Sequence, residues 1–232
     1  MTTDARHEHA ASGFRPPVPQ PIEITGPAGS IEARVEDPVP AGEAHSFVGV
    51  ACHPHPLHGG TMQNKVVHTC ARAMQEVGAA TVRFNFRGVG RSDGRYDAGH
   101  GELEDALAVV AWTRRRFQCD TLWLAGFSFG AAVALQAAVR GARPSRLVTI
   151  APPVGRIITE PVVRPECAWL IVQGDRDELV DLEAVRRWAA AYDPAPQLLV
   201  VPGAEHFFHG KLIELRKGIV RFLRKEVSEG SV

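Results

Sequence analysis

The fold is decided by residues 121–135, which read TLWLAGFSFGAAVAL. A short apolar run leads into an Ala-rich run typical of a helix, and the pattern G-x-S-x-G lies between them. We interpret this as a strand that turns abruptly into a helix, with Ser128 at the apex. Such a turn holds the serine at positive φ and exposes its hydroxyl, and only small residues such as Gly126 and Gly130 fit two positions away. The pattern therefore predicts a nucleophilic serine rather than a glycine-rich turn with an incidental one.

Strand and helix patterns alternate along the rest of the chain. Residues 22–24 and 31–35 alternate apolar and polar around a Gly-Pro-Ala-Gly turn, which predicts an antiparallel hairpin at a sheet edge. Further strands are expected at 47–52, 80–86, 146–151, 168–172 and 197–201, and helices at 61–77 (capped by Thr61), 102–117, 181–192 and 212–227. This order predicts an α/β fold, a doubly wound, mostly parallel sheet of about eight strands.

The segment 1–20 is polar and then Pro-rich, and we expect a flexible tail there, followed by one α/β domain over 21–232. Lys plus Arg equals Asp plus Glu at 26 each, so no charge surplus points to nucleic acid. The four cysteines lack paired spacing, and no run resembles a signal peptide or a membrane span, so we expect a cytoplasmic protein with buried free thiols. The sequence leaves open whether the chain forms a homodimer.

The residues suited to chemistry follow the expected strands. They are a histidine-rich loop at 53–60, a glycine-rich loop at 87–94, Ser128, the pair Asp175 and Asp177, and His206. Ligands of parallel α/β sheets bind beyond the carboxyl ends of the strands. These side chains are therefore expected to share one edge of the sheet.

A serine hydroxyl needs a base to take its proton, and a histidine held by a carboxylate is suited to that task. Ser128, an aspartate and His206 follow one another in the chain order that this topology requires. We favour Asp177 over Asp175, because the loop must leave its strand before it can reach the histidine. His206 is favoured over His209, because it lies nearer the end of its strand.

Five segments together resemble the α/β-hydrolase superfamily, in particular its small, lidless, dienelactone-hydrolase-like bacterial members. They are GFSFG at 126–130, GDRDELV at 174–180, GAEHFF at 203–208, HPHPLHGG at 53–60 and RGVGRSDG at 87–94. The resemblance extends from about residue 21 to the end, and it implies the catalytic triad Ser128, Asp177 and His206. Dienelactone hydrolases proper use a cysteine nucleophile, and this chain departs from them in carrying a serine.

The oxyanion hole is expected to use the N–H of Phe129, directly after the nucleophile. Pro54 and Pro56 lack an N–H, so the second donor is Leu57 or His55, and the resemblance places Leu57 there. Many relatives insert a lid where this chain has only the loop 152–166, which implies an open site for a small soluble ester. Candidates for the walls of an acyl pocket are Phe127, Phe129, Phe207 and Phe208, at least half of which we expect in the core.

The expected function is that of a serine carboxylesterase or thioesterase that needs no cofactor and acts on a small-molecule ester, with no nucleic-acid or membrane partner. Two alternatives are a metal-dependent hydrolase, in which His53, His55 and His58 hold zinc, and a non-catalytic binding protein on a hydrolase fold. The zinc alternative lacks an acidic residue before His58 and a fourth ligand motif. A complete triad in the expected order argues against the binding protein.

Overall fold

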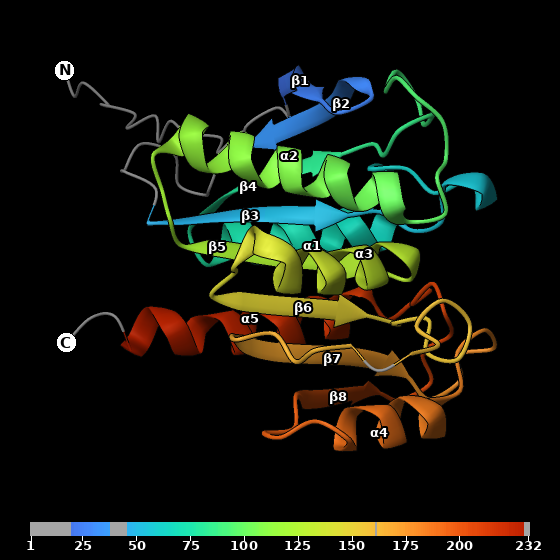
Figure 1. Ribbon diagram of the computed structural model, residues 1–232. Helices are drawn as coiled ribbons and strands as arrows, with labels where there is room; N and C mark the ends of the chain where they lie inside the picture. The colour runs from blue at the N-terminus through green and yellow to red at the C-terminus, as the bar shows by residue number, and fades with distance from the viewer. Residues whose placement is uncertain (1–19, 38–45, 161, 230–232) are drawn as a thin grey trace, which may run out of the picture.

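The computed structural model describes residues 20–37, 46–160 and 162–229, and an eight-stranded sheet runs through it (Figure 1). The strand order is β1-β2-β4-β3-β5-β6-β7-β8. The strands are β1 Gln20–Gly26, β2 Gly29–Glu36, β3 Phe47–Cys52, β4 Ala79–Phe84, β5 Leu122–Phe127, β6 Arg146–Ile150, β7 Ala168–Gly174 and β8 Gln197–Val201. The hairpin β1–β2 joins β4 in antiparallel fashion, and all other pairs are parallel. The predicted fold class is confirmed.

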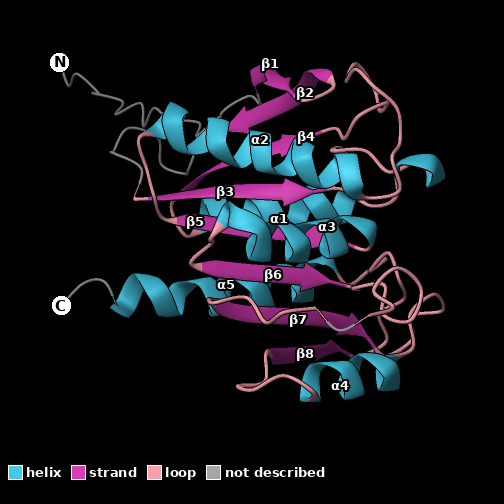
Figure 2. Ribbon diagram, in the orientation of Figure 1, coloured by secondary structure: helices cyan, strands magenta, loops and turns pink. Residues whose placement is uncertain are grey.

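Helices cover both faces of the sheet (Figure 2). They are α1 Lys65–Glu76, α2 His100–Phe117, α3 Phe129–Ala137, α4 Leu182–Ala190 and α5 Leu212–Glu229. One hydrophobic core lies between the sheet and α2, α3 and α4, and a second lies between the sheet and α1 and α5. The central strands β4, β5 and β6 are buried along their whole length, and β5 is apolar throughout, as expected for a strand covered on both faces. None of the helices in the described ranges is long and apolar enough to cross a bilayer.

Two local expectations require correction. Helix α1 does not begin at Thr61: its cap is Asn64, whose side-chain oxygen accepts the N–H groups of Val66 and Val67 at 2.9 and 3.4 Å. Thr61 instead accepts the N–H of Gln63 within the preceding turn. Of the four cysteines, three are buried as expected, whereas Cys167 is only half-buried. Of the segment predicted as a tail, only Gln20 lies within the described residues, and β1 begins with it.

A buried histidine fastens the loop after β3 to the chain that leaves β4. His53 is fully buried; its Nε2 accepts the N–H of Phe86 at 3.0 Å, and its Nδ1 lies 2.6 Å from the carbonyl oxygen of Pro54. Because Nε2 is an acceptor, the single proton of the neutral ring is on Nδ1, which donates to Pro54. Burial lowers the pKa of His53 to about 4, against a weaker opposing effect of the hydrogen bond to Pro54. His53 therefore holds the loop that faces Ser128.

We expect His53 to make the protein less stable in weak acid. The unfolded chain takes up a proton on His53 below its ordinary pKa of about 6.5, whereas the folded chain resists until about pH 4. The unfolded state thus binds more protons in this window, and the free energy of unfolding falls by about 1.4 kcal/mol per pH unit on acidification. Urea unfolding from pH 7.5 to 4.5 measures this slope.

In the variant His53→Asn the slope is expected to be smaller by this one-proton contribution. His209→Asn is the matched control, because the side chain of His209 is 70% exposed. Equal slopes for wild type and His53→Asn would contradict the assignment of the proton uptake to His53.

Candidate functional site

Ser128 lies at the tight turn between β5 and α3, with φ 53° and ψ −118°. Its N–H donates to the carbonyl of Ile150 at the end of β6, at 2.8 Å. A Cβ added to Gly126 would overlap the carbonyl of Gly130, and one added to Gly130 would overlap the carbonyl of His53. The turn thus has the positive φ and the crowding expected from the sequence, and it directs the Ser128 hydroxyl outward from the sheet edge.

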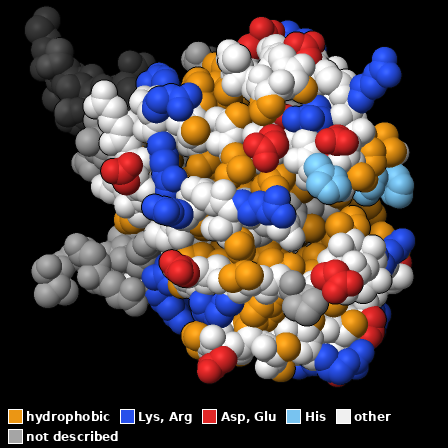
Figure 3. Space-filling model, viewed as in Figure 1, with side chains coloured by type: hydrophobic (Ala, Val, Ile, Leu, Met, Phe, Trp, Pro, Cys, Tyr) orange, Lys and Arg blue, Asp and Glu red, His pale blue; other side chains and the backbone are white. Residues whose placement is uncertain are grey.

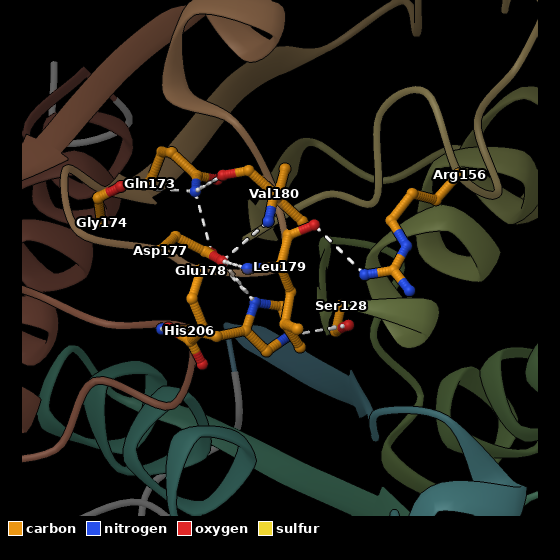
Figure 4. A network of polar contacts seen from close by, with 9 residues as sticks. All are labelled: Ser128, Arg156, Gln173, Gly174, Asp177, Glu178, Leu179, Val180 and His206. Atoms are coloured by element: carbon orange, nitrogen blue, oxygen red, sulfur yellow. Dashed lines mark hydrogen bonds and ion pairs between the residues drawn. The ribbon is translucent and has the colours of Figure 1, made fainter.

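The structure brings Ser128, His206 and Asp177 together at the carboxyl ends of β5, β8 and β7 (Figure 4). His206 Nε2 lies 3.1 Å from Ser128 Oγ, and His206 Nδ1 lies 2.9 and 3.1 Å from the two carboxylate oxygens of Asp177. The two alternatives lie elsewhere. Asp175 accepts the N–H of Gly203 at 2.6 Å, and the His209 side chain is exposed beside Glu205.

The carboxylate of Asp177 is surrounded by donors and has no solvent exposure. Besides His206, it accepts the N–H groups of Leu179 and Val180 and the side-chain amide of Gln173, each at 2.9 Å. Burial alone raises the pKa of Asp177. The hydrogen bond and charge of His206 and the two backbone N–H groups outweigh this, so the net pKa is below its usual value. Asp177 is therefore ionised at neutral pH.

This ionised carboxylate determines which nitrogen of His206 carries the proton. An acceptor-only group beside Nδ1 requires Nδ1–H, which leaves Nε2 with a lone pair directed at the Ser128 hydroxyl. The imidazole is nearly enclosed, with 3% of its side chain exposed. The arrangement has the geometry required to take a proton from an alcohol and to stabilise the resulting imidazolium.

The two candidates for the second oxyanion donor differ in their surroundings. Leu57 already donates its N–H to His55 Nδ1 at 3.2 Å, and its side chain is 66% exposed. His55, in contrast, lines the cavity beside Ser128 and Phe129, and Leu57 does not. Phe129 is the first residue of α3, so its N–H has no partner within the helix. The geometry favours His55 over Leu57.

A cavity of about 260 Å³ opens beside Ser128. The loop between β6 and β7 supplies Pro153, Arg156 and Ile157 to its wall, and residues 151–160 and 162–167, the described part of this loop, form no helix over it. Arg156 donates to the carbonyl of Leu179 at 3.2 Å, which ties the loop to the Asp177 segment (Figure 4). The site is thus bordered by a short loop at the position where many relatives insert a lid.

The four phenylalanines near the site have different environments. Phe127 and Phe208 are buried in the core, as expected for at least half of the four. Phe129 is also buried, but its side chain lines the cavity, whereas Phe207 is 41% exposed and packs edge-on against His206. Only Phe129 is therefore in position to form a cavity wall.

The histidine loop is not arranged as a metal site. Both ring nitrogens of His53 have protein partners, while His55 stacks on His58 at 4.5 Å and its Nε2 lies 3.2 Å from the Tyr96 hydroxyl. Within residues 20–37, 46–160 and 162–229, no three metal-binding side chains are grouped together. Reasoning from the sequence missed the role of His53, because a histidine on such a spacing gives no sign of which way its ring points.

Sequence reasoning also missed the residues that support Asp177. Gln173 is fully buried at the end of β7, which is an unusual place for an amide; this placement in an apolar strand was the one signal present. Two arginines of the loop 87–94 make ion pairs within the protein. Arg87 binds Asp105 at 2.8 Å, and Arg91 lies 3.5 Å from Glu32.

Comparison with known proteins agrees with this fold. The family model of serine aminopeptidases (S33) matches residues 55–165. An uncharacterised protein of Rickettsia prowazekii, RP471, is 33% identical over 214 residues, which are 87% of each chain.

Two solved structures are similar over nearly their whole length. XC6422 from Xanthomonas campestris, an α/β serine hydrolase without a lid, is 43% identical with a TM-score of 0.84, covering 91% of this chain and 96% of its own. An α/β serine hydrolase homologue from Coxiella burnetii is 46% identical with a TM-score of 0.81, covering 87% and 96%. These similarities, together with the fold, show that the chain belongs to the lidless α/β serine hydrolases of the α/β-hydrolase superfamily.

Proposed function

We propose that this serine hydrolase cleaves a small carboxylic ester or thioester, with Ser128 as nucleophile, His206 as general base and acid, and Asp177 as the partner of His206. The observation that carries the proposal is the continuous hydrogen-bonded row from Asp177 through both nitrogens of His206 to Ser128 Oγ. Asp177 is held in the ionised state that its role as partner of the imidazole requires.

In the first half-reaction, the Ser128 oxygen attacks the substrate carbonyl as His206 Nε2 takes the hydroxyl proton. The carbonyl oxygen becomes an oxyanion. His206 then returns the proton to the leaving oxygen or sulfur, and an acyl group remains on Ser128. In the second half-reaction, His206 takes a proton from water as the water oxygen attacks the acyl carbon. The bond between the acyl carbon and Ser128 Oγ then breaks, His206 returns the proton to Oγ, and the carboxylic acid leaves.

The oxyanion hole in this proposal consists of the N–H groups of Phe129 and His55. The first turn of α3 adds the positive end of its dipole at Phe129. His55 is chosen over Leu57 because the N–H of Leu57 already has an acceptor, the ring of His55 itself. That contact, and the one between His55 Nε2 and Tyr96, hold the loop against the cavity. Donors held in place in this way stabilise the developing charge without reorganisation.

The cavity beside Ser128 is open to solvent on one side, and its size favours a small substrate. Its volume of about 260 Å³ lies below the usual range for a drug-sized ligand, roughly 300–1,000 Å³. Ile157 and Leu179 on its rim are 43% and 42% exposed, so an apolar group can be partly covered there. Carboxylic esters and thioesters with small leaving groups fit these dimensions.

We expect Ser128→Ala to reduce kcat for p-nitrophenyl acetate by about a millionfold, because no other group in the row can form the acyl-enzyme. The thermal unfolding of the variant should remain close to that of the wild type. The assay panel compares p-nitrophenyl esters, acyl-thioesters and aminoacyl p-nitroanilides; the last class tests the peptidase activity that the matching family's name suggests. Ester turnover by the variant at the wild-type rate would refute the assignment of Ser128 as the nucleophile.

The two aspartates provide a second, internally controlled test. Asp177→Asn should reduce kcat roughly ten-thousandfold, because an amide favours the wrong tautomer of His206. Asp175→Asn should retain most activity, since Asp175 contacts the backbone N–H of Gly203 and not the imidazole. Both kcat values are measured at pH 8 on one ester. A larger loss in Asp175→Asn would exchange the roles of the two residues.

A further inference from the structure

A second cavity, of about 320 Å³, lies next to the one at Ser128. The two cavities share Phe129 and Ile157 as wall residues. The inner wall of the second cavity is apolar: Leu103 of α2 and Ala132 and Val133 of α3 are each at most 6% exposed. The polar side chains of His100, Arg140 and Glu160, which also line it, are exposed. None of the steps described above uses this space.

One face of α3 forms the length of the second cavity. Phe129, Ala132, Val133 and Gln136 all line it, at the spacing of three and four residues that places side chains on one side of a helix. The face begins directly after Ser128, and Gln136 lies roughly 10 Å farther along the helix axis. The exposed Arg140 lines the far end, so the apolar wall gives way to polar groups there. Figure 3 shows this side of the molecule, where hydrophobic side chains reach the surface between charged ones.

The position of His206 indicates which part of a substrate can reach this cavity. His206 gives its proton to the leaving group, so the leaving group must lie beside Nε2. His206 lines the first cavity and not the second. The part of the substrate that extends past Phe129 is therefore the part that remains on Ser128, which is the acyl arm.

We propose that the second cavity is the binding site for an unbranched, medium-length, uncharged acyl chain, and that Ala132 and Gln136 set the chain length that the enzyme prefers. This inference rests on the proposed hydrolase function and adds the substrate class. Each methylene group that enters an apolar site from water is worth roughly a fourfold gain in kcat/KM. The preference therefore rises from acetate to octanoate.

The test compares p-nitrophenyl acetate, butyrate, hexanoate and octanoate on the wild type and on the variants Gln136→Trp and Ala132→Met, which fill the cavity. We expect the ratio of kcat/KM for octanoate to that for acetate to fall at least about tenfold in both variants. Ala111→Met is the matched control, because Ala111 is exposed on α2 and does not line the cavity. Unchanged ratios in variants that hydrolyse acetate normally would overturn the proposal.

Binding without chemistry separates this proposal from the hydrolase function. In a calorimetric titration with sodium octanoate, the wild type should bind the anion at least about tenfold more tightly than Gln136→Trp does, and acetate should show no such difference. Equal octanoate affinities would overturn the acyl site even in an active esterase. A difference in a protein that hydrolyses no ester would support the cavity assignment and refute the hydrolase function alone.

Discussion

The contact between the backbones of β5 and α3, where Gly126 meets Gly130, is the constraint on which the site depends. It leaves no room for a Cβ, and it forces the residue between the two elements into a conformation with φ 53°. Such a conformation costs of order 1–3 kcal/mol and persists only when its surroundings hold it. Here the N–H of Ser128 is bound to β6, and its carbonyl accepts the N–H of Ala131 at 2.8 Å. The orientation of the hydroxyl is thus a property of the packed sheet and not of a flexible loop.

The positions of Asp177 and His206 depend on how the loops after β7 and β8 are joined. Strands β7 and β8 are neighbours, with Gly174 paired to Val201, so the loops that follow them leave the sheet side by side. Asp175 accepts the N–H of Gly203, and Glu178 accepts the N–H of His206 at 3.2 Å. These two acidic residues cross-link the loops, while Asp177 between them binds the imidazole. The three carboxylates of this short segment thus have different roles, which follow from the group that each one binds.

Much of the fold followed from pattern alone, because buried parallel strands leave long apolar runs and helices leave amphipathic ones. The run 197–201 was predicted with the bounds it has as β8. Helix starts do not follow from pattern alone, since Thr61 and Asn64 are both good caps and the packing of the preceding turn selects between them. The contact of Asp177 with His206 was predicted from loop reach. The preference for His55 over Leu57 in the proposed oxyanion hole rests on a local hydrogen bond, which residue spacing does not encode.

The sequence by itself determined the order of elements, the turn at Ser128 and the edge of the sheet at which the chemistry lies. These features depend on local geometry and on the rule that parallel strands all end at one edge. Only the tertiary structure decided that the buried His53 holds the loop after β3 to the chain that leaves β4. It also decided that Gln173 supports Asp177 and that α3 carries an apolar face beside a second cavity. The physical reason is that these contacts join residues far apart in the chain, and their geometry depends on the packing of whole elements against one another.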